Sequence, residues 1–555
     1  MKFRVLIFSL LILFVYGCST SRQAAKNTSP TLSEPVDTVN FAELNKPPED
    51  WYRLDENRTQ FRGISAKLAY NTLLSDKEPK RKVIVAIIDS GIDIDHEDLK
   101  DNIWTNEGEI PGNGIDDDGN GYVDDVHGWN FAGGSDGKNV EHDTFELTRI
   151  YSKLIPEFQN ADTTVFNEEK RKRYQYYKKI KSDYRYEIEK YLTQYENIVQ
   201  FENTLQQADS ILTAHFEGSY SEKDLQNLEA SSREIAFAKN VVNYANENEI
   251  DSAVIVDQKK HIYEFAKYGY NPNYNPRHIV GDDYDDKTER YYGNNDVKGP
   301  DPTHGTHVAG IIGAIRNNSI GINGIADNIA IMPIRAVPNG DERDKDIANA
   351  IFYAVDNGAD IISMSFGKSY SPDKWIVDKA VKYANEHNVL MVHAAGNSSE
   401  NIDVKPNFPT DHLVVSDDSL MADLWIAVGA SGWNPDRFVA NFSNYGKENV
   451  DVFAPGVSIY STVPDNKYER LQGTSMAAPV VTGIAALVMS YYPDLSARQV
   501  KDIILKSVVK YPDLTVAVPH KAGKEAVNGL FTNLSVSGGV VNVYRALKLA
   551  EEMTK

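Results

Sequence analysis

Two polar side chains stand where an expected strand ends and where an expected helix begins, and both could take part in nucleophilic chemistry. Asp89 follows the apolar run Val83–Ile88, at the point where a buried strand gives way to a loop. Ser475 follows a Gly-Thr turn at the start of a long apolar helical segment. A serine at a helix N-terminus has an exposed hydroxyl, lies at the positive end of the helix dipole, and can offer its own free backbone N–H to an oxyanion.

Two histidines lie three residues apart in the stretch DPTHGTHVAG, residues 301–310, which reads as the start of another helix. His304 and His307 could be a metal pair, a catalytic base beside a structural histidine, or polar groups at a helix end. The familiar helical zinc motif spaces its histidines four apart with a glutamate between them, and a zinc site would need a further ligand from elsewhere. Asp89, His304 and Ser475 thus occur in that order, each at the edge of an element.

Short apolar runs separated by helical patterns are the elements that must position these side chains. Such runs, bounded by charge or glycine, are typical of strands buried in a parallel sheet that helices cover on both faces. Strands are expected at Val83–Ile88, Ile329–Val337, Ile361–Phe366, Val389–Ala395, Trp425–Ala430 and Val450–Phe453, and helices from His304, at Asp344–Asn357 and at Pro372–His387.

Composition narrows the functional classes. With 41% hydrophobic and 25% charged residues, the chain can bury a large core. Its net charge of −22 repels phosphate backbones, so no nucleic-acid partner is expected, and the basic cluster at 169–179 is interpreted as a solvated helix face.

The N-terminus predicts export. Lys2 and Arg4 precede an apolar run that is too short to span a bilayer comfortably and suits a secretory signal. The residues that follow, Val-Tyr-Gly-Cys, resemble the lipobox of bacterial lipoproteins, which implies lipidation of Cys18 and a membrane anchor; an ordinary cleaved signal or an uncleaved anchor is the alternative. Cys18 is the single cysteine, so no internal disulfide can form. We predict a signal at 1–18 and a flexible, Ser/Thr/Pro-rich tether at 19–50.

Three blocks of sequence closely resemble the signature blocks of the subtilisin-like serine proteases, in that family's chain order. They are IIDSGID around Asp89, HGTHVAG around His304 and GTSMAAPVVTG around Ser475. The resemblance implies a three-layer α/β/α sandwich with a mainly parallel sheet. It also implies that Ser475 is the nucleophile, His304 the general base and acid, and Asp89 the group that holds the imidazole. His307 would then be a structural helix residue.

The resemblance extends to the substrate-binding residues. The stretch HAAGNS around Asn397 is similar to the block whose asparagine amide supplies the second oxyanion donor. SMSFG, residues 363–367, is similar to the strand that pairs with substrate, so Ser365 and Gly367 on one side and Gly396 on the other would wall the specificity pocket. A roomy apolar pocket predicts broad cleavage after large hydrophobic residues, although its floor falls in the unaligned segment 398–424.

An acidic loop follows the first block and predicts a calcium site. Asp116, Asp118, Asn120 and Asp124 occupy alternate or near-alternate positions around a glycine turn, like the hard oxygen ligands of an EF-hand loop. His127 stands where the bidentate glutamate belongs. The alternative is a turn cluster without metal. No cofactor is expected for the chemistry, and structural Ca²⁺ is the one ion the resemblance implies.

The 215 positions between Asp89 and His304 leave room for an insertion, which we place at 143–280 between two parts of the catalytic domain, 51–142 and 281–555. Its apolar residues recur every seven positions, which predicts a long amphipathic helix, with a second helix near 223–248 packed back on it. The seam comprises Tyr177, Tyr184, Tyr191, Ile198, Leu205 and Leu212. The insertion would be either a lid or exosite at the cleft or a purely structural addition.

The sequence therefore predicts an exported, lipid-anchored serine endopeptidase of the bacterial cell envelope that acts on polypeptides. A protease dedicated to one envelope partner is one alternative, and a pseudoenzyme that only binds is another. Secreted members of the family usually carry an inhibitory pro-domain, but only about thirty tether-like residues precede the catalytic domain. Either folding needs no such domain, or residues 51–82 and the insertion take its part.

Overall fold

The computed structural model describes residues 39–555 except 42, 248–249, 415–419 and 522. The expected signal, Cys18 and the first part of the expected tether lie outside the described residues. The described part of the tether packs on the folded chain: the Phe41 and Phe61 rings lie 5.2 Å apart, and the Pro47 carbonyl accepts a hydrogen bond from Arg470.

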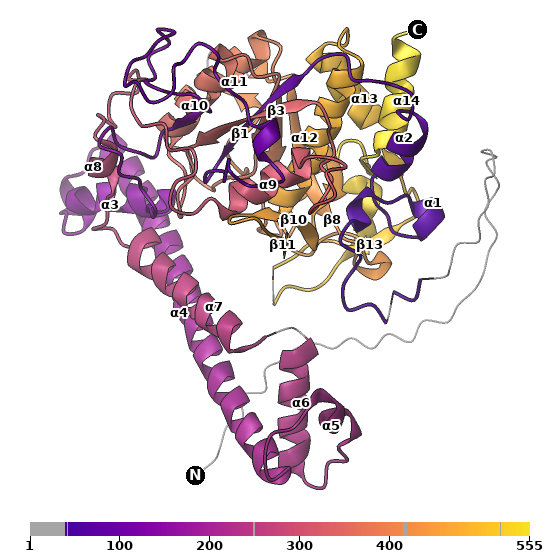
Figure 1. Cartoon of the computed structure of the whole chain (residues 1–555). Helices are drawn as coiled ribbons and strands as arrows, with labels where there is room; N and C mark the ends of the chain where they lie inside the picture. The colour runs from indigo at the N-terminus through magenta and orange to yellow at the C-terminus, as the bar shows by residue number, and fades with distance from the viewer. Residues whose placement is uncertain (1–38, 42, 248–249, 415–419, 522) are drawn as a thin grey trace. The chain divides into compact units, whose positions relative to one another are not determined.

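A nine-stranded sheet forms the centre of the molecule (Figure 1). All of its neighbouring strands run parallel except β12 and β15 at one edge, which pair antiparallel. The sequence-based expectation of a mainly parallel sheet is confirmed. In spatial order the strands are β12 (Val509–Lys510), β15 (Gly539–Val540), β9 (Val452–Pro455), β8 (Trp425–Ser431), β5 (Leu390–Ala394), β4 (Ile361–Met364), β1 (Val83–Asp89), β3 (Ile329–Arg335) and β2 (Trp129–Asn130).

Strand β1 lies inside the sheet between β3 and β4, in a register that pairs Val85 with both Ile331 and Ile361. Asp89 is its last residue and pairs with Arg335. Because the strands are parallel, their carboxyl ends meet along one edge of the sheet, which is where ligands bind in such folds. Asp89 therefore opens onto the functional edge, as expected.

Helices cover both faces of the sheet. Val83, Val85 and Ile87 of β1 belong to one apolar cluster, and Ala86 and Ile88 to the other. The first cluster holds α2 (Ala66–Thr72), α9 (Thr303–Gly313), α12 (Thr474–Tyr491), α13 (Ala497–Lys506) and α14 (Val543–Met553), and the second holds α10 (Asp344–Asp356) and α11 (Lys374–Glu386). The three-layer α/β/α sandwich is thus confirmed. Helix α12 is long and apolar enough to cross a membrane, but 94% of that stretch is buried, so the core accounts for its composition.

The segment before β1 is part of this core. Trp51 and Ile64 are fully buried in the first apolar cluster, and the Ile64 carbonyl accepts a hydrogen bond from the backbone of Val543. The indigo helix α2 and the yellow helix α14 consequently lie side by side (Figure 1). Residues 51–74 thus fold with the last helix of the chain.

Residues 143–280, the insertion, contain helices and no named strand among their described residues. Helix α4 packs on α3 near its start and on α6 and α7 further along, so the chain folds back as the heptad seam indicates. The second helix, expected near 223–248, is divided into α5 and α6, and α7 was not expected. The helices are α3 (Glu146–Phe158), α4 (Glu168–His215), α5 (Glu222–Asn227), α6 (Arg233–Glu247), α7 (Ser252–Glu264) and α8 (Arg277–Val280).

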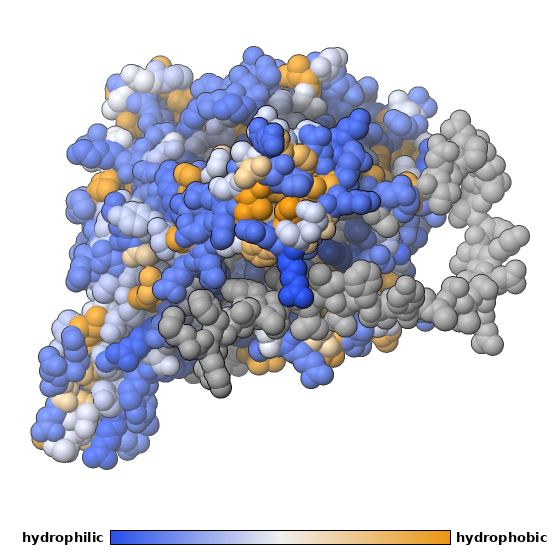
Figure 2. All heavy atoms as spheres, turned by 90° about the horizontal axis from the view of Figure 1, so that it is seen from below, coloured by the Kyte–Doolittle hydropathy of each residue, from blue (hydrophilic) through white to orange (hydrophobic). Residues whose placement is uncertain are grey.

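Three short antiparallel pairs complete the fold: β6 (His412–Leu413) with β7 (Leu420–Met421), β10 (Ile459–Val463) with β11 (Lys467–Leu471), and β13 (Thr515–Ala517) with β14 (Asn528–Leu530). A single-turn helix, α1 (Glu56–Thr59), precedes α2. On the face shown in Figure 2, hydrophilic residues predominate and apolar residues form small groups. This surface agrees with the 25% of charged residues in the sequence.

Candidate active site

His304, which is partly exposed, and the buried Asp89 form a hydrogen-bonded pair at the carboxyl edge of the sheet. Asp89 is 2% exposed at the end of β1, and its Oδ1 lies 2.7 Å from His304 Nδ1. His304 is in the first turn of α9, which begins beside this strand end. A carboxylate is an acceptor only, so Nδ1 donates the proton and Nε2 is left with its lone pair. The pair therefore presents a basic nitrogen.

The environment of His304 adjusts its basicity. Burial disfavours the imidazolium, but the negative charge and hydrogen bond of Asp89, together with the charge of Asp301, raise the pKa of His304 above its usual 6.5. An opposite charge in direct contact favours the protonated form. His304 is consequently a stronger base than a free imidazole.

His307 is held by hydrogen bonds to backbone carbonyls of the β10–β11 pair. It is fully buried, and its Nε2 donates to the carbonyls of Ile459 and Glu469 at 3.0 and 3.2 Å. Burial lowers the pKa of His307 to about 3, so the ring is neutral. The two histidines of DPTHGTHVAG therefore separate into a histidine paired with a carboxylate and one that ties α9 to the β10–β11 pair.

Ser475 lies in the first turn of α12, where its backbone N–H has no acceptor within the helix. Its hydroxyl donates to the Ser365 carbonyl at 3.0 Å, and the Ser365 hydroxyl donates to the Ser475 carbonyl at 2.9 Å. These reciprocal bonds join the nucleophile to the segment that follows β4. The expected nucleophile and the expected substrate strand are thus neighbours.

Asn397 is held so that its amide nitrogen is free to donate. Its Oδ1 accepts hydrogen bonds from the backbone N–H and the hydroxyl of Thr474, both at 2.9 Å. The Thr474 hydroxyl in turn accepts from the Gly396 backbone N–H at 3.0 Å. Since the carbonyl end of the amide is taken, Nδ2 becomes the donor beside Ser475. The sequence pointed to Asn397 but gave no signal for the role of Thr474.

A cleft of about 1220 Å³ contains Ser475 and the expected pocket residues Ser365, Gly367 and Gly396. Asn407 also lines it. A Cβ atom at Gly367 would lie 2.4 Å from Asn407 Nδ2, and one at Gly396 would lie 3.1 Å from it. The Asn407 amide therefore lies against both glycines, and it gives a polar group to a pocket that the small residues alone predict to be apolar.

A second buried histidine supports the cleft. His393, in β5, is 2% exposed and its Nε2 donates to the Phe366 carbonyl at 2.8 Å. Burial lowers the pKa of His393 to about 4, so the imidazole stays neutral. It fixes the segment between Ser365 and Gly367 from behind. Nothing in the sequence distinguished this histidine from an ordinary core residue.

Comparison with known proteins agrees with this geometry. The sequence profile described as "Subtilase family" matches residues 80–533, which is most of the chain. This chain belongs to the subtilase family. It is accordingly a hydrolase of the serine endopeptidase class.

Individual relatives match shorter stretches. Subtilisin DY of Bacillus licheniformis is 40% identical over 214 residues, which cover 38% of this chain and 72% of the relative. Thermitase of Thermoactinomyces vulgaris is 40% identical over 188 residues, which cover 34% of this chain and 61% of the relative. Among solved structures, a protease from Pseudoalteromonas arctica PAMC 21717 is 27% identical, covers 46% of this chain and 78% of its own, and has a TM-score of 0.37.

Two of the predicted calcium ligands in the acidic loop of this subtilase accept hydrogen bonds from backbone N–H groups of the same loop. Asp116 accepts hydrogen bonds from the backbone N–H groups of Asn120 and Gly121 at 3.1 and 2.8 Å. Asp124 accepts from the backbone of Asn113 and Gly114 at 3.1 and 2.8 Å. Asp116 and Asp124 thus shape the turns of the loop.

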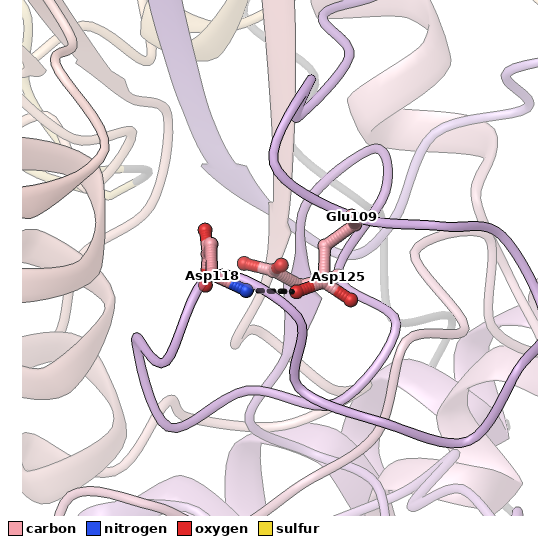
Figure 3. A group of neighbouring side chains, drawn as sticks. All are labelled: Glu109, Asp118 and Asp125. Atoms are coloured by element: carbon pink, nitrogen blue, oxygen red, sulfur yellow. Dashed lines mark hydrogen bonds between the residues drawn. The ribbon is translucent and has the colours of Figure 1, made fainter.

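Three other carboxylates converge in the same loop. The oxygens of Glu109, Asp118 and Asp125 lie within 4.8 Å of one another (Figure 3). Asp118 was among the predicted ligands, whereas Glu109 and Asp125 were not. The Asn120 amide donates to both Asp118 and Asp125 at 3.1 Å, so it lies beside the cluster.

Burial is the main cause of the raised pKa of Asp125; hydrogen bonds from Tyr353, Asn106 and Asn120 oppose the shift, and the charge of Asp118 adds to it. Three hard oxygen donors with crowded negative charge suit a calcium ion, which takes carboxylate oxygens as ligands. The carboxylates of Glu109, Asp118 and Asp125 therefore fit the ion that the family resemblance implies.

Proposed function

We propose that this subtilase hydrolyses peptide bonds of proteins through Asp89, His304 and Ser475. The observation that carries the proposal is the 2.7 Å bond between His304 Nδ1 and Asp89 Oδ1, at the same sheet edge as Ser475 in the first turn of α12. A histidine oriented in this way leaves Nε2 as the proton acceptor for a serine hydroxyl.

The proposed reaction has two stages. As Ser475 Oγ attacks the carbonyl carbon, its proton passes to His304 Nε2, and the imidazolium then gives that proton to the leaving amine. An ester between the acyl group and Oγ remains. A water molecule next loses a proton to Nε2 and attacks the ester, and Oγ leaves with the proton, which releases the acid and restores the enzyme.

The negative oxygen formed in each stage would accept hydrogen bonds from the Ser475 backbone N–H and from Asn397 Nδ2. The helix dipole of α12 adds to this stabilisation because the serine lies at its N-terminus. Thr474 takes part as a positioning residue, since it holds the oxygen end of the Asn397 amide.

For the residue before the scissile bond we propose broad acceptance with a preference for large hydrophobic side chains. Gly367 and Gly396 line the cleft without side chains of their own, and Ser365 and Phe366 line it beside them. The Asn407 amide adds an expected preference for tyrosine over phenylalanine. A tyrosine hydroxyl can form a hydrogen bond with this amide, whereas phenylalanine has no hydroxyl.

The substrates we propose are polypeptides met outside the cytoplasm, with the enzyme held to the bacterial envelope through lipid on Cys18. The signal-like N-terminus and the lipobox-like residues before Cys18 support this placement. We also propose that Ca²⁺ binds at Glu109, Asp118 and Asp125 and stabilises the loop.

A protease dedicated to one partner is the second candidate. Side chains of helix α4 line the same cleft as Ser475, so the insertion borders the route of the substrate. A narrowed cleft favours chains that can thread between its walls.

The test is labelling of a soluble form, residues 19–555, which lacks Cys18, by a fluorophosphonate probe. We expect covalent labelling of the parent protein and none of a Ser475→Ala variant with the same melting temperature. Labelled parent protein that degrades denatured casein would support the general endopeptidase, whereas labelling without casein cleavage would favour the dedicated protease. A folded parent that takes up no label would contradict the proposed mechanism.

A further inference from the structure

The insertion supplies one wall of the catalytic cleft. Tyr186, Glu187 and Lys190 of α4 line the same cavity of about 1220 Å³ as Ser475 and Asn397. These residues lie within the insertion, far from the triad in sequence. A substrate in this cleft therefore contacts two surfaces. One belongs to α4, and the other to the catalytic module, which comprises residues 51–142 and 281–555.

The cleft is rich in aromatic side chains at its α4 side. Two rings from the catalytic module, Phe366 and Tyr370, are joined there by four from the insertion, Phe145, Tyr186, Tyr191 and Tyr270. Tyr270 packs on Phe145 and Tyr191, with ring centroids 4.7 and 5.2 Å apart. Tyr186 remains 60% exposed although it lines a cavity. Exposed aromatic surface in a cleft is typical of a binding site, since rings lose little conformational freedom on binding.

Contacts with the module hold α4 beside the substrate strand. The Tyr370 hydroxyl donates to Asp183 at 2.6 Å and accepts from Lys179 at 3.1 Å. Tyr370 lies three residues beyond Gly367, so the segment that leads away from Ser475 runs to α4. An extended peptide laid along residues 365–370 would reach the aromatic side chains of α4.

Lys521 is a further lining residue close to the same part of α4. It forms a 2.6 Å ion pair with Glu400. The hydrogen bond to Glu400 raises the pKa of Lys521, burial opposes this, and the charges of Glu400, Glu187 and Tyr186 add to the rise. The charges of Glu187 and Lys190 are also balanced, because their side chains lie 3.2 Å apart. Glu187 and Lys521 thus already have partners of opposite charge, and the exposed ring of Tyr186 is the aromatic surface that this part of the cleft offers.

We propose that the insertion forms a second substrate subsite, centred on Tyr186, which binds a bulky apolar side chain of an extended polypeptide several residues away from the scissile bond. This inference rests on the proposed function, because it assigns a substrate contact to the same cleft. It makes α4 a specificity element of the protease.

The experiment compares Tyr186→Ala with Tyr195→Ala in the soluble protein. Both tyrosines lie on α4, but Tyr195 is 38% exposed and does not line the cleft. The substrates derive from one peptide bond that the parent protein cuts in denatured casein. A short peptide around this bond is compared with peptides lengthened at the N-terminal or the C-terminal end. In the lengthened peptides, each added position in turn carries Phe or Ala. The measured quantity is kcat/KM for every peptide.

We expect the parent to prefer Phe over Ala about three- to tenfold at one added position, mainly through KM. Tyr186→Ala should lose this preference and still cut the short peptide at the parental rate, whereas Tyr195→Ala should keep the preference. A parent that labels with the probe and shows no preference at any added position would overturn the second subsite and leave the proposed function standing. A preference that survives Tyr186→Ala would also overturn it. Absence of both labelling and cleavage would overturn the two together.

Discussion

The central helix of the catalytic module and the long helix of the insertion border one cleft but are built in opposite ways. In α12, 17 of 18 residues are buried, whereas in α4 only five of 48 are. Each buried apolar side chain stabilises the fold by about 1.5–3 kcal/mol, so α12 is fixed by its surroundings on every side. Helix α4 is held mainly at the Tyr177 and Leu212 ends of its seam.

This contrast separates two tasks. Catalytic groups must be held within fractions of an ångström, and Ser475 accordingly stands in the first turn of a helix whose other residues are all buried. An extended substrate can bind to a helix that is held less rigidly, and α4 is such a helix. Changes in the module should therefore alter the rate of bond cleavage, while changes in the insertion should alter which chains are cut.

The largest expected effect is that of Asp89→Asn. The amide has the same shape but can donate to His304 Nδ1, which favours the tautomer with its proton on Nε2. We expect kcat/KM to fall by about 10⁴-fold without a change in melting temperature. Activity above a tenth of the parental value would show that Asp89 does not hold the tautomer.

Asn397→Ala should have the next largest effect. Loss of one oxyanion donor should lower kcat by about 10²- to 10³-fold and leave KM nearly unchanged. Steady-state kinetics on one peptide would measure it. Thr474→Ser keeps the hydroxyl that holds Asn397 and should retain most activity; an equal loss in both variants would mean that folding of the turn, not oxyanion binding, was affected.

The pH profile should report His304 and no other histidine of the cleft. His304 must be neutral to act, and Asp89 raises its pKa, so kcat/KM should increase with pH through a midpoint above 6.5 and fall about tenfold per unit below that midpoint. His393, with a pKa of about 4, stays neutral throughout. A flat profile between pH 5 and pH 9 would contradict the role of His304.

The junction between module and insertion should be sensitive to Glu146→Gln. Glu146 in α3 is buried, and it binds Arg149 Nη2 at 2.6 Å and Lys368 Nζ at 3.0 Å. Removing its charge leaves both cations short of a partner, which should lower the free energy of unfolding by about 3 kcal/mol in urea titrations. The matched control is Lys190→Gln, which breaks an exposed pair and should cost less than about 0.5 kcal/mol. Similar losses in both would show that burial of the first pair is unimportant.

The smallest effect concerns the acidic loop. Removal of calcium by EDTA should lower the melting temperature by a few degrees, about what loss of a ligand held at roughly 100 times its Kd gives in a protein of this size. The shift should vanish in Asp118→Asn and persist in Asp116→Asn, because only Asp118 belongs to the converging group. A shift that persists in Asp118→Asn would place calcium elsewhere.

The sequence predicts six of the nine strands of the central sheet; β2, β12 and β15, of two residues each, were not expected because so short a strand leaves no periodic pattern. The six expected strands all occur, shifted by at most a few residues, since each is an apolar run that only a two-sided sheet can bury. The pairing of His304 with Asp89 was expected from the motif blocks. The heptad pattern likewise predicted α4, because a seven-residue repeat marks a helix face whatever it packs against.

The sequence did not predict tertiary contacts between segments that carry no recognisable pattern. Asn407 reaches Gly367 and Gly396 from a segment with no recognisable pattern. Glu109 joins Asp118 and Asp125 across a loop whose alternating acids suggested a different ligand set. The entry of α4 into the cleft depends on Tyr370 and Asp183, 187 positions apart. Neither the periodicity of apolar residues nor the spacing of a motif predicts such tertiary contacts.

The burial of Trp51 and Ile64 beneath the helices of the module bears on how the enzyme matures. Many zymogens are activated by cutting away everything that precedes the catalytic domain. Here a cut just before β1 would remove two fully buried anchors of the apolar core and the carbonyl that receives the Val543 N–H. Release of this segment would therefore destabilise the core, so we expect residues 51–74 to stay bound to the working enzyme.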